Sequence, residues 1–194
     1  MRSTLYRLAG RHWPVLTITL LAILLVGPLW ETPGLPNSAD GPLHLHRAAA
    51  VARAFASGLF WPRWFPEVYG GLGAPTFHYY SPLFYWLTAA LHSSGLALDS
   101  AAKVLISLAF FLSALAAFGW LRGLFGGLPA LIGALLFLTQ PHLFREFYFQ
   151  GDYPQLLAIL LLPICLYSFT GLAACRRKPV EQWRDWLSRQ RQIE

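Results

Sequence analysis

Charged residues are scarce in this chain: Asp, Glu, Lys and Arg make up 12% of its 194 residues, whereas 56% are hydrophobic. Soluble globular domains carry a charged share of about 25%. Several apolar runs also approach the roughly 20 residues that a helix needs to cross a bilayer. The composition therefore excludes an ordinary soluble domain and predicts an all-α integral membrane protein.

Cysteine is scarce as well. The two cysteines, Cys165 and Cys175, lie ten residues apart on one predicted helix. That spacing separates them by about 15 Å along the helix axis. A disulfide needs Cα atoms within about 7 Å of each other, so these two residues cannot form one, and they say nothing about the redox compartment.

Acidic residues are the minority charge, with 9 Asp and Glu against 15 Lys and Arg and a net charge of +6. The basic residues lie at the two ends and in short connections, and they do not form a patch interleaved with aromatics on a soluble domain. Nucleic acid is therefore not an expected partner. We interpret the positive charge as a signal of membrane topology.

Four apolar segments are predicted to cross the membrane within a polytopic region that covers residues 1–175. They are residues 14–30, 101–121, 128–140 and 154–174. Arg2 and two further arginines precede the first segment and place the N-terminus in the cytoplasm. The loop 31–100 is then external, and the polar tail 176–194 is cytoplasmic. A cleaved signal peptide is the alternative for the start of the chain, but the first apolar run is long and no small-x-small cleavage site follows it.

The segment from Pro82 to Leu98 is also apolar, but it is not expected to cross. If it crossed, Arg122 and the basic cluster at 176–178 would become external, against the tendency of Lys and Arg to stay inside. If it lies at the surface or only dips into the bilayer, both basic regions remain inside. We therefore predict an interfacial or re-entrant segment here.

The external loop carries a predicted amphipathic helix, which would lie along the membrane interface next to the first span. Pro42 fits its first turn, where the missing N–H costs nothing, so the helix is expected to begin near Asp40. Asp40, His44 and Arg47 follow at spacings of four and three, which places an acid, an imidazole and a guanidinium on one helix face. Glycine, proline and aromatic residues crowd the stretch 58–86 and predict a folded-back interfacial loop.

Asp40 and Asp152 are the candidate catalytic residues, because the predicted topology returns both carboxylates to the external face. Asp40 would act as a general base that accepts a proton from an acceptor hydroxyl. The candidate substrate-binding residues are basic or aromatic, suited to pairing with phosphate oxygens, stacking on sugar faces or lining the entry of a lipid tail. They are His44, Arg47, Arg53, Arg63, Trp64, His78, Tyr79 and Tyr80.

Plainer interpretations stay open for these residues. Asp40 and Asp152 both precede helices and are suitable N-caps. His44 fits an interfacial polar position, and the aromatics fit a membrane belt. Two carboxylates are too few ligands to predict a divalent cation, so no cofactor is predicted and a metal site stays unknown. A transporter is disfavoured because no charged residue lies in the middle of the four segments.

The layout resembles the polytopic GT-C superfamily of glycosyltransferases, in which a first span is followed by a long external loop with an essential Asp near its start. It is most similar to the bacterial membrane proteins described as 6-pyruvoyl-tetrahydropterin synthase related, a label that we do not take as a clue to pterin chemistry. The resemblance covers residues 5–175. It is carried by ADGPLHLHR, GLFWPRWFPEVYGGLGAPTFHYYSPLFYW, AAKVL, WLRGLFG, LFLTQPHLF and QGDYPQLLAILLLP.

The resemblance implies that Asp40 corresponds to the catalytic carboxylate of the first external loop and Asp152 to a second acidic residue in the next one. The donor would be a polyprenyl-phosphate sugar, and transfer would take place on the outer face of the bacterial inner membrane. Members of the superfamily have more than four spans. We therefore expect this chain to be the N-terminal part of such an enzyme, truncated and inactive alone or completed by a membrane partner that supplies the missing helices.

The alternative hypothesis is a non-catalytic membrane protein, such as an assembly partner or a lipid-binding subunit, that uses the same aromatic loop as an interface. Membrane lipids are expected partners under both hypotheses, whereas a lipid-linked sugar donor is expected only under the first.

Overall fold

The computed structural model describes the backbone of residues 2–31 and 33–190, and the side chains of residues 12–31 and 33–173. Within these ranges the regular secondary structure is helical, and the extended pairing is a single isolated bridge between Phe65 and Ala74. The expectation of an all-α membrane protein is therefore confirmed.

Four helical segments are each long and apolar enough to cross a bilayer. They are His12–Glu31 in α1 (Arg2–Glu31), α4 (Leu98–Phe125), Gly127–Gln150, and Tyr153–Ala173 in α7 (Tyr153–Gln190). This agrees with the four predicted spans. Since α7 continues as a helix to Gln190, the polar stretch from 176 onward extends the last span. The cytoplasmic location of this stretch stays a prediction. The structure does not describe its side chains, and residues 191–194 lie outside the described part of the chain.

The third span is a composite of three helical pieces that continues past residue 140 to Gln150, six residues beyond the extension toward Phe144 that the shortness of the apolar run predicts. It consists of α5 (Gly127–Leu138), α6 (Pro141–Phe144) and the π-helical turn η2 (Arg145–Gln150). Pro141 explains the interruption, because proline lacks the N–H that a helix interior needs but fits the first turn of the next helical piece.

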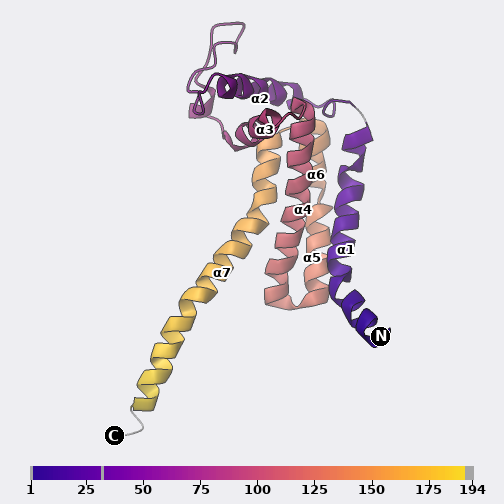
Figure 1. Ribbon diagram of the computed structural model, residues 1–194, viewed down its shortest axis with the longest axis vertical. Coiled ribbons are helices and arrows are strands. Elements are labelled where there is room, and N and C mark those ends of the chain that lie inside the picture. Colours follow the sequence, from indigo (N-terminus) through magenta and orange to yellow (C-terminus); the bar gives the residue numbers. More distant parts are fainter. Residues whose placement is uncertain (1, 32, 191–194) are drawn as a thin grey trace.

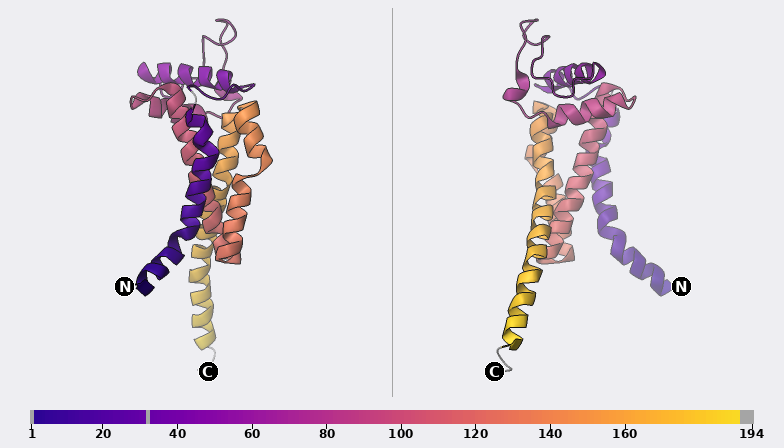
Figure 2. Two further views of the ribbon diagram at one scale, coloured as in Figure 1. Left: turned by 90° about the vertical axis from the view of Figure 1, so that its right-hand side faces the viewer. Right: turned by 60° about the vertical axis from the view of Figure 1, so that its left-hand side comes forward.

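The spans stand side by side, and two shorter helices lie across one end of them (Figure 1). These are α2 (Gly41–Ala56) and α3 (Leu83–Ser93), and further views show both crossing above the bundle (Figure 2). We call this the loop end of the molecule. With 11 residues, α3 is about 16 Å long, too short to cross a hydrocarbon core of about 30 Å. It is therefore not a span, as expected for residues 82–98, and its location at the membrane interface stays a prediction.

The first span shows how the bundle divides its surface between protein and lipid. Its buried residues recur every three or four positions and face the other helices: Ile18, Ala22, Val26 and Leu29. Its exposed residues are equally apolar and include Leu16, Leu20, Ile23 and Leu24. A helix that is apolar on all sides and buried along one face only fits contact with membrane lipid on its outer face.

Candidate functional site

Asp40 stands at the N-cap position of α2, as its spacing from Pro42 predicts. Its carboxylate makes no capping hydrogen bond to the helix. The amide Nε2 of Gln150 donates to Asp40 Oδ2 at 2.6 Å instead. The helix start therefore fixes the position of Asp40, while a residue from the far end of the third span orients its carboxylate.

The segment before α2 and the connection before α7 meet through their backbones. The N–H of Ala39 donates to the carbonyl of Phe149 at 3.0 Å, and the N–H of Asp40 donates to the carbonyl of Gln150 at 2.8 Å. Gly151 makes the approach possible, because its φ of +71° is left-handed and a Cβ there would lie 2.8 Å from the backbone N of Gly41. Glycine alone adopts this conformation readily and leaves the space.

Asp40 and Asp152 therefore lie at the same end of the bundle, within one group of interacting polar side chains. We call this group the polar cluster. It consists of Asp40, His44, Arg47, Tyr80, Tyr85, Gln150 and Asp152.

His44 is the buried centre of the polar cluster, with 2% of its side chain exposed. Its Nδ1 lies 2.7 Å from the Tyr85 hydroxyl, and its Nε2 lies 3.6 Å from Asp152 Oδ1. Tyr80 also reaches this carboxylate, since its hydroxyl donates to Asp152 Oδ1 at 3.2 Å. His44 on α2 thus lies against Asp152, in the connection between the third span and α7.

The protonation states in the cluster follow from burial. Burial lowers the pKa of the His44 imidazole, an effect that Asp152 opposes, so the ring is neutral at pH 7. Burial raises the pKa of the Tyr85 hydroxyl, which therefore keeps its proton. Tyr85 then donates to His44 Nδ1, and the imidazole proton sits on Nε2, the nitrogen that faces Asp152.

Arg47 completes the face formed by Asp40 and His44. Its guanidinium carbon lies 4.8 Å from the ring centroid of Tyr80, a cation–π contact. Its Nε is buried and has no hydrogen-bond partner among the described residues. Buried N–H groups are nearly always paired, so this donor suits an acceptor oxygen of a bound molecule.

The remaining predicted binding residues lie outside the polar cluster. Arg53 pairs with Glu67, its Nη2 at 2.8 Å and its Nε at 3.1 Å from Glu67 Oε1. Trp64 packs against Gly73. The side chains of Arg63, His78 and Tyr79 are exposed, Tyr79 to 86%.

Sequence reasoning missed Tyr85 and Gln150. Tyr85 lies in an aromatic run that reads as a membrane belt, so nothing local distinguishes it from its neighbours. A signal for Gln150 was present, because Gly151 follows it between two apolar segments and indicates a tight connection there.

Groups of three or more His, Cys, Asp or Glu side chains able to share a metal ion do not occur in the part of the chain that the structure describes. The polar cluster itself offers two carboxylates, an imidazole and a guanidinium.

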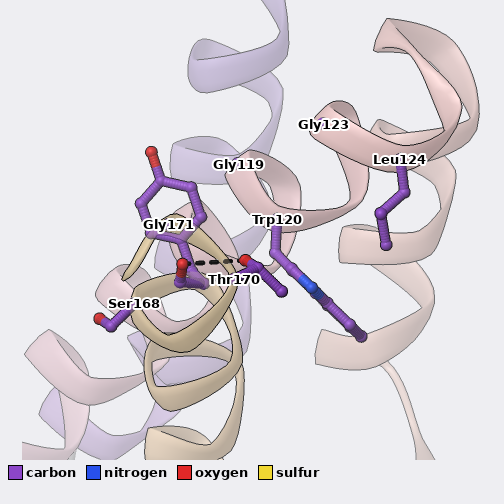
Figure 3. A pocket seen from close by; sticks show the side chains of 8 residues that line it. Gly119, Trp120, Gly123, Leu124, Ser168, Thr170 and Gly171 are labelled. Atoms are coloured by element: carbon purple, nitrogen blue, oxygen red, sulfur yellow. Dashed lines mark hydrogen bonds between the residues drawn. The ribbon is translucent and has the colours of Figure 1, made fainter. Parts of the chain in front are cut away.

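One cavity lies away from the polar cluster, between α4 and α7 toward the other end of the bundle (Figure 3). It encloses about 500 Å³ between Gly119, Gly123 and Gly171, and Trp120 and Tyr167 also line it. One of the hydroxyl groups in its wall already has a partner within α7, since Thr170 Oγ1 donates to the carbonyl of Tyr167 at 3.0 Å. None of the predicted site residues lines it, so it is not part of the candidate site.

The lowered pKa of His44 predicts acid sensitivity. The unfolded chain binds the proton more readily than the folded one, so stability is complete above the unfolded pKa of about 6.5 and declines as pH falls below it. We expect the melting temperature of the detergent-solubilised protein to drop between pH 7.5 and 5.5, and His44→Gln to reduce the drop. His78→Gln, at an exposed histidine, is the matched control. An equal drop in the His44 variant would contradict this protonation state.

Comparison with known protein families identifies a membrane-protein domain in this chain. A family model for the 6-pyruvoyl-tetrahydropterin synthase related domain, described as a membrane protein, matches residues 77–182, more than half of the chain. Tyr80, Tyr85 and Asp152 lie inside the match, whereas Asp40 and His44 precede it. No curated protein and no solved structure matches.

Proposed function

Since the chain belongs to the 6-pyruvoyl-tetrahydropterin synthase related family of membrane proteins, we propose that it acts in that setting as the N-terminal part of a GT-C-type glycosyltransferase. It would transfer a sugar from a polyprenyl-phosphate donor to an acceptor at the loop end. The observation that carries this proposal is the polar cluster, which combines two carboxylates from distant segments with an arginine that has an unpaired buried donor.

Asp40 is the proposed general base. Its carboxylate would take the proton of an acceptor hydroxyl as the oxygen attacks the anomeric carbon of the donor sugar. The bond between that carbon and the phosphate oxygen breaks, and the polyprenyl phosphate leaves as an anion. Arg47 lies one turn further along the same face of α2 than His44, where its guanidinium would stabilise the departing charge.

Asp152 and His44 would position the other groups of the site. The imidazole Nε2 faces Asp152, and Tyr80 holds the same carboxylate. This arrangement holds the Asp152 carboxylate beside Tyr80, whose ring the Arg47 guanidinium contacts. In this proposal Asp152 sets the orientation of Tyr80 and thereby of Arg47, while Asp40 takes part in the reaction.

A deletion strain of the native host provides the direct test. Membranes from the strain complemented with this gene should transfer radiolabelled sugar from a polyprenyl-phosphate donor to the envelope fraction, and membranes carrying the empty vector should not. Transfer that depends on a nucleotide-sugar donor in place of the lipid-linked one would contradict the proposal, and so would equal transfer in both membranes.

The proposal places the loop end on the outer face of the bacterial inner membrane, which cysteine labelling tests. After replacement of Cys165 and Cys175 by serine, single cysteines are introduced as Leu72→Cys at the loop end and Gly127→Cys at the opposite end. Leu72 is 83% exposed, and a Cβ at Gly127 meets nothing within 4 Å. We expect a membrane-impermeant maleimide to label Leu72→Cys in intact cells and Gly127→Cys only after permeabilisation. The reverse pattern would contradict transfer on the outer face.

A non-catalytic role as an assembly partner remains the second candidate, and exposed apolar residues in the loop after α2 favour it. Leu72 and Tyr79 are 83% and 86% exposed. Protection of Leu72→Cys from labelling in native membranes, combined with an absence of transfer, would support this role over the enzymatic one.

A further inference from the structure

A second cavity lies at the loop end, outside the polar cluster. It encloses about 250 Å³ between the C-terminal half of α2 and the loop that follows, with Ala50, Arg53, Trp64 and Glu67 in its wall. That loop rises above α2 on the side away from the spans (Figure 1). The wall of the cavity therefore belongs to α2 and its following loop, outside the four spans.

Trp64 forms a flat, fixed wall of this cavity. Its indole packs on Gly73 so closely that a Cβ at Gly73 would lie 2.5 Å from Nε1 and 2.6 Å from Cε2. Gly73 also has a left-handed φ of +79°, which favours glycine a second time. Despite this support Trp64 remains 56% exposed, so the backbone fixes the indole while much of its surface stays accessible.

The loop that carries Trp64 is anchored to the protein core. Phe65 and Ala74 exchange two backbone hydrogen bonds of 2.9 and 3.1 Å, which fix the residues next to Trp64 and Gly73. The buried Phe65 ring packs edge-on against Phe77 at 4.9 Å, and Phe77 stacks on Tyr85 at 5.4 Å. The indole is thus pre-organised, so binding to it requires little ordering of the loop.

The ion pair of Arg53 and Glu67 supplies the polar wall. Both guanidinium hydrogen bonds reach the same oxygen, Glu67 Oε1. The pair therefore presents a planar donor and a carboxylate acceptor side by side. A phosphate would be repelled by Glu67 and a cation by Arg53, whereas a neutral molecule with several hydroxyl groups can donate to one and accept from the other.

We propose that this cavity is a saccharide-binding subsite, in which Trp64 stacks against the apolar C–H face of a sugar ring and Arg53 with Glu67 binds its hydroxyl groups. As an acceptor subsite it rests on the proposed function. His44 and Arg53 are separated by nine positions on α2, about 14 Å along the helix. The subsite would therefore hold a sugar unit of the acceptor remote from the reacting hydroxyl, whose binding energy helps to position the reacting end.

Saturation-transfer NMR on the solubilised full chain tests the subsite without any transfer reaction. The probes are methyl β-D-glucopyranoside, methyl α-D-mannopyranoside, cellobiose and mannobiose, with inorganic phosphate as the anionic comparison. We expect signal transfer to ring protons of at least one sugar, at least tenfold weaker affinity in Trp64→Ala, and no competition by phosphate. Trp61→Ala is the matched control, because Trp61 is 54% exposed in the same loop but does not line the cavity.

Glu67→Gln provides a second variant that keeps the shape of the side chain and removes its charge. It should weaken sugar binding several-fold while leaving the melting temperature unchanged, since the ion pair is largely solvent-exposed. Absence of sugar binding, equal binding in Trp64→Ala, or displacement by phosphate would each overturn the subsite. Sugar binding in a chain that transfers no sugar would overturn the proposed function but not the subsite.

Discussion

Replacing Asp40 with asparagine is expected to lower sugar transfer by about 10²- to 10⁴-fold, the range typical for loss of a general base. The substitution removes the ability to accept a proton and little else. The asparagine side-chain oxygen can still accept the hydrogen bond that Gln150 now donates to Asp40 Oδ2 at 2.6 Å. The helix start is also unaffected, because Asp40 makes no side-chain capping bond. Transfer is measured in membranes of the complemented deletion strain, at equal protein level.

Asp99→Asn is the matched control for this prediction. Asp99 is an acidic residue in the first turn of α4 and lies outside the polar cluster. It undergoes the same chemical change, so its variant should transfer sugar at the wild-type rate. Wild-type transfer by Asp40→Asn would remove Asp40 from the reaction. A lowered melting temperature of Asp40→Asn would indicate instead that the Asp40 carboxylate stabilises the fold.

The gathering of Asp40, His44 and Arg47 on one face was predictable because it depends only on helical periodicity. Spacings of four and three place side chains on the same side of any α-helix, and Pro42 marks where that helix begins. Likewise, the four spans follow from the length and polarity of the apolar runs. These are local properties, so they can be read from short stretches of sequence.

The contacts that complete the site depend instead on tertiary packing. Gln150 reaches Asp40 across 110 positions, and Tyr80 reaches Asp152 across 72. No local pattern specifies such pairs. The same limit explains why Arg53 and Trp64 were grouped with Arg47 as one binding set. All are basic or aromatic residues of one loop, but their positions along α2 and beyond it separate them into the polar cluster and the second cavity.

Glycine at position 151 is expected to be among the least replaceable residues of the fold. Its φ of +71° makes an alanine there unfavourable by about 1–2 kcal/mol, because the left-handed conformation crowds a Cβ. A Cβ would also lie 2.8 Å from the backbone N of Gly41 and would collide with the Ser38 side chain. Overpacking of this kind adds about 1–3 kcal/mol. Gly151→Ala should therefore destabilise the protein by about 2–5 kcal/mol.

Gly34→Ala separates the two causes of this loss. Gly34 has a similar φ of +75°, but a Cβ there meets nothing within 4 Å. Gly34→Ala should therefore lower the free energy of unfolding only by the conformational contribution, about 1–2 kcal/mol, and it should leave sugar transfer intact. Chemical denaturation in detergent measures both variants. Because the close approach of Gly41 and Gly151 helps to hold Asp40 and Asp152 together, Gly151→Ala should also reduce transfer in the population that still folds. Equal stability of Gly151→Ala and Gly34→Ala would show that the contact between Gly151 and Gly41 accommodates a Cβ. The positions of the two aspartates would then not depend on a glycine at position 151.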